Sequence, residues 1–179
     1  MSRITPVDAT GEPEELRAVF DELRRTRGRV PGMYRTLAHR PEILEAHRAY
    51  FRAALDQGVL PRGLKEQIAF KVASDRGSEY SAASHRRYAT SHGVSDTVLD
   101  QIAGSDYSGL ATADRVALEF ADEAVRTRGA VSDATFESLA TAFTDIEIVE
   151  LSALVGIMEL ASTLGAVFAL SPDPSETAQ

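Results

Sequence analysis

The sequence contains no cysteine among its 179 residues. Thiols supply disulfides, thiolate nucleophiles and the soft ligands of many metal sites, so this absence excludes all three together. It also removes cysteine usage as an indicator of the redox compartment. Any catalysis by side chains of this protein must therefore use oxygen and nitrogen groups.

Positive charge is also scarce. The chain has 19 Lys and Arg against 27 Asp and Glu, and its net charge at pH 7 is −8. This balance argues against a nucleic acid or an anionic membrane as partner. Apolar residues at 44% and charged residues at 26% are typical of a soluble globular protein. We expect one domain over residues 1–170 and a disordered tail over 171–179, which holds Pro172 and Pro174.

An apolar N-terminal segment is missing. Residues 1–8 lack the hydrophobic stretch of a secretory signal, so we expect a cytoplasmic protein. The longest apolar run, residues 151–170, is long enough to cross a bilayer. It carries Glu159 near its middle and has no Lys or Arg at either flank, which favours a buried helix of a soluble protein.

The sequence shows no β-strand pattern, because no segment alternates apolar and polar residues between turn signals. Helix signals recur instead. Leu16, Val19, Phe20 and Leu23 form an i, i+3, i+4, i+7 stripe that Gly28 ends. The sequence therefore predicts an all-α protein of roughly eight to nine helices. Helices are expected over residues 14–27, 33–38 and 41–54, from 61, and over 78–91, 96–103, 112–128, 133–142 and from 145 onwards.

Four polar side chains recur at helical spacing in the middle of the chain. Ser78, Ser81, His85 and His92 stand at i, i+3, i+7 and i+14, so we expect one helix face to carry two hydroxyls and two imidazoles. Glu66 lies twelve residues before Ser78, on the preceding helix, and can bring a carboxylate to this face. A carboxylate, an imidazole and nearby hydroxyls are the minimum set for proton transfer.

Each of these residues also has a structural interpretation. Glu66 lies in the first turns of its helix, where the helix dipole favours a solvated or capping carboxylate. A lone histidine such as His85 is more often a satisfied core or surface side chain than a catalyst. His92 precedes the helix-ending Gly93, where a cationic imidazole caps the C-terminal dipole, and this capping role is the one we favour.

Glu159 and Tyr80 are further candidates for the pocket. Glu159 lies in an apolar helix with no cation nearby in sequence, so it must be protonated, paired, or facing a cavity or a subunit boundary. Tyr80 is offset from His85 on the same helix. It packs as a core aromatic with its hydroxyl bonded, or it lies near the pocket.

A serine hydrolase and a metal centre are both disfavoured. Ser81 lies one turn from His85, but there is no Gly-x-Ser-x-Gly turn, no Asp within helical reach of His85 and no evident oxyanion hole. His85 and His92 lie about 10.5 Å apart along an ideal helix, too far to share one ion easily. We expect neither a metal nor a cofactor.

The segment from Glu66 to His85 resembles the core motif of the alkylhydroperoxidase D (AhpD) / carboxymuconolactone decarboxylase family. In that motif a glutamate is followed, after about a dozen residues, by Cys-x-x-Cys-x-x-x-His. Ser78 and Ser81 stand at the two cysteine positions. The resemblance covers most of the chain. It includes residues 30–41 as the N-terminal signature, Glu79-Tyr80 as a subgroup feature, Ala89 and Gly93 at the family spacing, and residues 131–151 as the C-terminal helices.

The resemblance implies an AhpD-like helical bundle that associates into a homo-oligomer. Our leading hypothesis is a cofactor-independent lyase or decarboxylase, or a related proton-transfer enzyme, acting on a small carboxylated, lactone or polyketide-like metabolite. The alternative is a catalytically silent binding or assembly protein that kept the fold after losing the thiols. In the enzyme, Glu66 and His85 would form the acid/base pair, with Ser78, Ser81, Tyr80, His92 and Glu159 near the substrate.

Peroxide reduction by a thiol pair should be absent from this protein. That reaction uses a Cys-x-x-Cys thiolate pair, and Ser78 and Ser81 cannot form the disulfide. We expect the purified protein to show no hydroperoxide turnover with a dithiol or lipoyl-type reductant. A coupled peroxidase assay checks this, and metal-free turnover above the buffer rate would contradict the assignment of the site.

Overall fold

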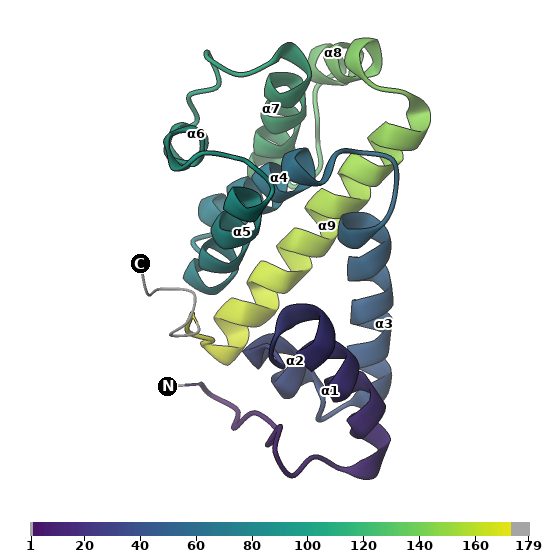
Figure 1. The fold of residues 1–179 in the computed structure, drawn as a ribbon. Coiled ribbons are helices and arrows are strands. Elements are labelled where there is room, and N and C mark those ends of the chain that lie inside the picture. The colour runs from purple at the N-terminus through teal and green to yellow at the C-terminus, as the bar shows by residue number, and fades with distance from the viewer. Residues whose placement is uncertain (1, 173–179) are drawn as a thin grey trace.

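The computed structural model describes residues 2–172, and every regular element within them is helical (Figure 1). The predicted all-α class is confirmed, with nine α-helices and one π-helical turn in the described chain. Residues 173–179 of the predicted tail lie outside the described residues. The elements are α1 (Glu14–Arg27), α2 (Gly32–Leu37), α3 (Pro41–Phe51), the π turn η1 (Arg52–Asp56), α4 (Arg62–Asp75), α5 (Glu79–Ser91), α6 (Asp96–Ala103), α7 (Thr112–Thr127), α8 (Asp133–Ala142) and α9 (Asp145–Phe168).

The long helix α9 organises the bundle. It runs diagonally through the molecule, with α3 on one side and α4 and α5 on the other (Figure 1). Its first half, including Leu151 and Leu154, packs in the larger apolar cluster, which α4 and α7 share. Its last turns, with Leu164 and Phe168, pack against a second cluster built by α1, α2 and α3. Helix α9 therefore joins the N-terminal helices to the rest of the bundle.

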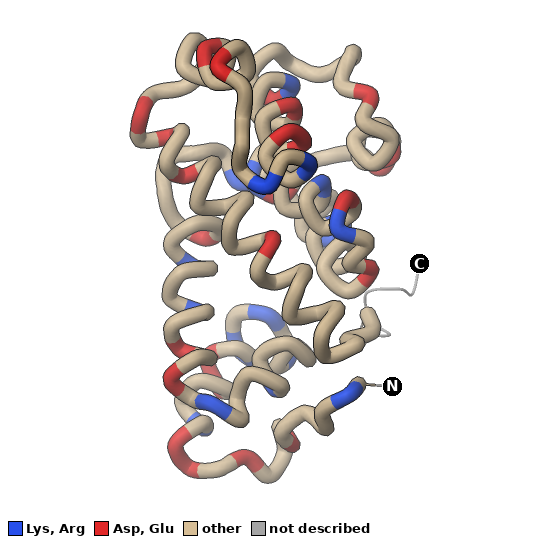
Figure 2. The backbone as a smooth tube through the Cα atoms, turned by 180° about the vertical axis from the view of Figure 1, so that it is seen from behind, with Lys and Arg blue, Asp and Glu red and all other residues tan. Residues whose placement is uncertain are grey.

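Local sequence signals fix where α9 begins. Thr144 accepts a hydrogen bond from the backbone of Glu147, whose side chain bonds back to Thr144, so the capping box expected here is present. Beyond residue 150, Glu159 is the one charged residue of this helix (Figure 2). Its length and composition would allow it to span a membrane, but 44% of its most apolar window is buried in the bundle.

The end of α3 departs from the prediction. The sequence predicts a helix through residue 54, whereas α3 ends at Phe51 and a π turn follows. After this turn Gly58 takes a φ of +100°, and a Cβ there would lie 2.3 Å from Glu150 Oε1. The chain turns tightly against α9, and the wider π turn points the Leu55 carbonyl and the Asp56 side chain toward α4.

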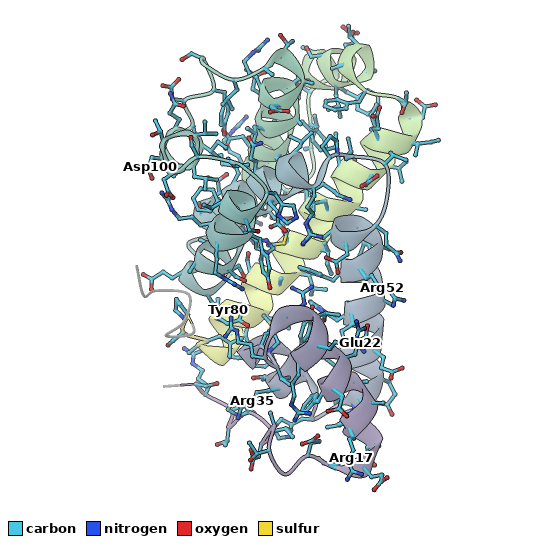
Figure 3. All side chains as sticks on the ribbon, viewed as in Figure 1. Arg17, Glu22, Arg35, Arg52, Tyr80 and Asp100 are labelled. Carbon is cyan, nitrogen blue, oxygen red and sulfur yellow. The ribbon has the colours of Figure 1, made fainter. Side chains whose placement is uncertain are left out.

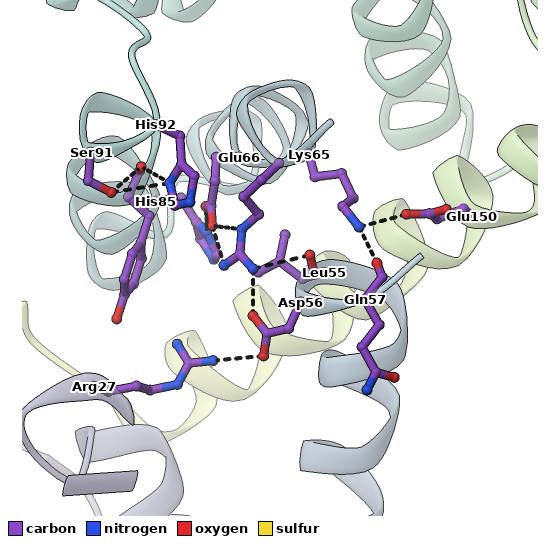
Figure 4. A network of polar contacts seen from close by, with 12 residues as sticks. Arg27, Leu55, Asp56, Gln57, Lys65, Glu66, His85, Ser91, His92 and Glu150 are labelled. Carbon is purple, nitrogen blue, oxygen red and sulfur yellow. Dashed lines mark hydrogen bonds and ion pairs between the residues drawn. The ribbon is translucent and has the colours of Figure 1, made fainter. Parts of the chain in front are cut away.

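A buried ion pair holds this connection against α9. Lys65 Nζ on α4 lies 2.6 Å from Glu150 Oε1 on α9 and also donates to the carbonyl of Gln57 (Figure 4). The other carboxylate oxygen of Glu150 accepts a hydrogen bond from the Val59 backbone at 2.8 Å. Each charge is therefore satisfied by the other and by backbone groups, as burial requires.

Replacing Glu150 by alanine should destabilise the protein strongly. The substitution leaves Lys65, whose side chain is 3% exposed, as an uncompensated buried cation. We expect a loss of about 3–5 kcal/mol in the free energy of unfolding, measured by chemical denaturation. Glu137→Ala, at an exposed position of α8, is the control and should change stability by less than about 0.5 kcal/mol. Equal stabilities of the two variants would contradict this role of the ion pair.

Candidate active site

Glu66 and His85 meet inside the bundle. Glu66 on α4 is fully buried and His85 on α5 is 5% exposed. His85 Nδ1 lies 2.7 Å from Glu66 Oε2, a hydrogen-bond distance. The structure brings the two residues together across the packed helices α4 and α5. It excludes a solvated role for Glu66.

Arg62 holds the second oxygen of the same carboxylate. It lies one turn before Glu66, and its Nε and Nη2 atoms are 2.7 and 2.6 Å from Glu66 Oε1. Arg62 Nη1 also donates to Asp56 Oδ1 at 2.7 Å and to the Leu55 carbonyl at 3.2 Å. Asp56 Oδ2 in turn lies 3.5 Å from Arg27 Nη2. A continuous chain of polar contacts thus runs from His85 to Arg27 (Figure 4).

The charges around Glu66 keep its side chain ionised, and this carboxylate orients the imidazole of His85. Burial raises the pKa of Glu66, but the neighbouring His85 and Arg62 outweigh burial, so the pKa is lowered below its ordinary value. Glu66 is therefore a carboxylate that accepts the Nδ1–H of His85. This hydrogen bond orients the imidazole and leaves Nε2 as the nitrogen available to a ligand.

An inner cavity of about 60 Å³ lies beside His85. Ser81, Tyr80 and His47 contribute to its lining together with Phe51. The Tyr80 hydroxyl accepts a hydrogen bond from the Met33 backbone at 3.1 Å, which ties α5 to α2. The inner cavity therefore joins an imidazole, a hydroxyl and a phenol within a largely aromatic enclosure.

An outer cleft of about 560 Å³ adjoins the inner cavity. Four arginines line it, of which Arg62 contacts Glu66 and Arg48 pairs with Glu22. Figure 3 shows Glu22 on α1 and Arg52 just after α3. The cleft and the cavity share part of their lining. The shared residues, which we call the common wall, are Arg27, Tyr34, Phe51 and Tyr88.

His47 is a member of this site that the sequence did not indicate. It is 7% exposed, its ring stacks on Phe51 at 6.0 Å and it meets Tyr34 edge-on at 5.8 Å. Neither ring nitrogen has a hydrogen-bond partner among the described residues. Burial lowers the pKa of His47 to about 4, so the imidazole is neutral at pH 7.

Three of the predicted site residues lie outside the inner cavity. Ser78 occupies the N-cap position of α5, where a Cβ built on Gly165 of α9 would lie 3.5 Å from its hydroxyl. His92 borders the outer cleft, and its Nδ1 lies 2.8 Å from the Tyr88 carbonyl at the end of α5. Glu159 forms an ion pair with Arg76 at 3.6 Å, so its partner comes from the same chain.

Several site residues were not predicted from the sequence, for different reasons. Arg62 had a local signal, because it stands four residues before Glu66 on one helix. Arg27, His47 and Asp56 had none, since they come from three separate elements and meet only in the packed bundle. Among the described residues no group of three or more metal-ligating side chains is found.

Comparison with solved structures identifies the fold. A peroxidase-related protein from Ralstonia eutropha JMP134, described as an alkylhydroperoxidase AhpD core, superposes with a TM-score of 0.87 and 25% identity over 98% of this chain and 94% of its own. A peroxidase-related protein from Silicibacter sp. TM1040 gives a TM-score of 0.87 at 21% identity over 99% and 96%. The resemblance to AhpD-like proteins is thus confirmed for the fold.

A further neighbour is an enzyme with another activity. A variant of the debrominase Bmp8 in complex with 2,3,4-tribromopyrrole superposes with a TM-score of 0.84 at 21% identity, over 98% of this chain and 96% of its own. No protein-family model matches the sequence. No curated protein matches it either.

His47 should make the stability of the protein depend on pH between 6.5 and about 4. The folded state holds this imidazole neutral, with a pKa of about 4 against an ordinary 6.5. The unfolded chain therefore takes up a proton first as the pH falls, and stability that is complete above pH 6.5 is lost toward pH 4. The pKa difference corresponds to about 3 kcal/mol.

Denaturation of the wild type and of His47→Phe across this range measures the effect. The variant lacks the titrating group, so its free energy of unfolding should fall less steeply than that of the wild type. Parallel curves for the two proteins would contradict the burial of a neutral His47.

Proposed function

We propose that this AhpD-like protein is a cofactor-independent proton-transfer enzyme acting on a small carboxylated, lactone or polyketide-like metabolite. The supporting observation is the 2.7 Å contact between His85 Nδ1 and the fully buried Glu66 carboxylate, beside a cavity. A carboxylate that orients an imidazole through one nitrogen leaves the other nitrogen to act as general base and general acid.

His85 removes and returns the proton in this mechanism. As the general base, its Nε2 takes a proton from a substrate carbon next to a carbonyl group. The electron pair of the broken C–H bond moves to the carbonyl oxygen and forms an enolate, while Glu66 stabilises the imidazolium. Ser81, which lines the cavity, donates a hydrogen bond to the enolate oxygen. Return of the proton to the same or a neighbouring carbon completes exchange or isomerisation.

The same groups serve a lyase or decarboxylase reaction. The electron pair of the bond between the substrate carbon and a carboxylate passes to the conjugated carbonyl, and carbon dioxide leaves. His85, which takes up a proton from solvent at Nε2 before this step, then donates that proton to the carbon, and a further solvent proton restores it for the next turnover. Both reactions are redox-neutral, so neither requires an external oxidant or reductant.

The substitution of both thiols directs the proposal away from thiol peroxidase chemistry. Ser78 and Ser81 cannot pass electrons through a disulfide. The debrominase among the structural neighbours supports the view that this fold serves other chemistry than peroxide reduction. Association into a homo-oligomer in the cytoplasm is part of the proposal. It is supported by the exposed apolar side chains Ile146, Val149, Leu160 and Val167 on α9.

His85→Gln tests the function directly. The glutamine cannot take up the proton, so turnover should fall by about a hundredfold or more. The assay follows deuterium incorporation from heavy water, and release of carbon dioxide, by NMR for a panel of small keto acids and carboxylated lactones. Because the amide of the glutamine still offers an N–H to Glu66, the free energy of unfolding should stay within about 1 kcal/mol of the wild type.

His39→Gln is the matched control. His39 is exposed and lies outside both cavities, with its Nε2 2.9 Å from the Thr5 carbonyl. It should keep wild-type turnover. An equal loss in both variants would argue against His85 as the acid and base. Ligand binding by the wild type without any proton exchange would favour the alternative, a silent binding protein with this fold.

A further inference from the structure

Three basic side chains surround the ring of Phe51. The guanidinium carbon of Arg27 lies 5.5 Å from the ring centroid, and the rings of His47 and His85 lie at 6.0 and 6.1 Å. All three side chains line the inner cavity. They come from α1, α3 and α5, so the bundle brings them to one enclosure without any local sequence pattern.

Arg27 carries a charge that its neighbours neutralise only weakly. Its side chain is 16% exposed and lies between the rings of Tyr34 and Tyr88, at 5.9 and 5.8 Å from their centroids. Its ion pair among the described residues is with Asp56 at 3.5 Å, and Asp56 lies closer to Arg62, at 2.7 Å. A guanidinium binds a carboxylate through two parallel hydrogen bonds, so Arg27 retains donors for a second anion.

His47 supplies a second binding group in the same cavity. Both of its ring nitrogens are buried without a partner among the described residues, although one must donate and the other accept. A buried polar group left unpaired is unfavourable, and a polar ligand atom removes that cost. An alcohol or a carbonyl oxygen of a ligand satisfies the N–H of a neutral imidazole.

The size of the inner cavity limits the ligand. A group the size of one water molecule needs roughly 10–15 Å³ of cavity volume. The cavity of about 60 Å³ therefore admits a chain of about four to six non-hydrogen atoms. Because Arg27 belongs to the common wall, a carboxylate bound to it stands at the mouth of the cavity and the chain reaches inward.

We infer that the inner cavity binds a small oxo- or hydroxy-carboxylate, with its carboxylate on Arg27, its oxygen on His47 and its carbon chain alongside Phe51 and His85 Nε2. The inference deepens the proposed function, on which it rests for the role of His85. The carboxylate that binds Arg27 stays on the substrate during the reaction, because its ion pair with Arg27 stabilises it against leaving as carbon dioxide.

Wild-type protein and matched small molecules test the inference without any substitution. The probes are 4-oxopentanoate, its amide and pentanoate, which differ by one charge or one carbonyl. NMR titration should give at least tenfold weaker binding for the amide than for 4-oxopentanoate. Pentanoate should bind about fivefold more weakly, since it leaves His47 unpaired. Equal affinities of the three probes, or no binding at millimolar concentrations, would overturn the inference.

Variants of three arginines locate the anion site. Arg27→Gln should weaken 4-oxopentanoate binding at least tenfold and leave binding of the amide unchanged. Arg25→Gln, at an exposed position of the same helix outside both cavities, is the matched control and should bind like the wild type. Arg52→Gln tests general attraction into the outer cleft. Equal losses in Arg27→Gln and Arg52→Gln would overturn a specific site at Arg27.

Two further measurements separate failure of folding and failure of the proposed function. Arg27→Lys keeps the positive charge. If this variant still binds 4-oxopentanoate more tightly than its amide, the site is supported even if Arg27→Gln unfolds. Binding is measured without turnover and should persist in His85→Gln. The two ideas can also fail separately. If the wild type exchanges protons but Arg27→Gln still binds 4-oxopentanoate normally, the carboxylate site at Arg27 is wrong and the proposed function stands.

Discussion

The buried hydrogen bond between Glu66 and His85 is the interaction on which the rest of the site depends. A carboxylate removed from water is stable only when its oxygens are paired, and here Arg62 takes one oxygen and His85 the other. Arg62 is in turn held by the Leu55 carbonyl and by Asp56. The π turn after α3, the start of α4 and the middle of α5 are thereby fixed relative to one another. This explains why an irregular turn lies next to the buried polar contacts of the site.

Aromatic packing divides the space beside this network into an outer cleft and an inner cavity. Phe51 lies at the boundary, with His47 stacked on its ring, His85 tilted against it and Arg27 above it. Both imidazoles are buried, with His47 7% and His85 5% exposed, so both lie in a medium less polar than water. In such a medium the charge of Arg27 and the open nitrogens of His47 interact with a ligand more strongly than they would in water.

Much of the fold follows from short-range signals in the sequence. Gly28 ends α1 in the left-handed conformation, with a φ of 74°, and Thr144 with Glu147 begins α9 with a capping box. Such signals act within one helical turn, which is why they can be read without the fold. The spacing from Glu66 to His85 likewise predicted that the two would meet. The π turn at residues 52–56 was missed because it depends on the packing of Gly58 against Glu150 of α9.

By itself the sequence determined the helical class, the order of the helices and the presence of a carboxylate and an imidazole on adjacent helices. Only the tertiary structure decided which groups surround them. It placed Ser81 in the cavity and Ser78 outside it, gave Glu159 a partner in Arg76, and buried His47 beside Arg27. The reason is physical. Helix geometry fixes the spacing of near neighbours, whereas contacts between α1, α3 and α5 arise from side-chain packing that no local pattern specifies.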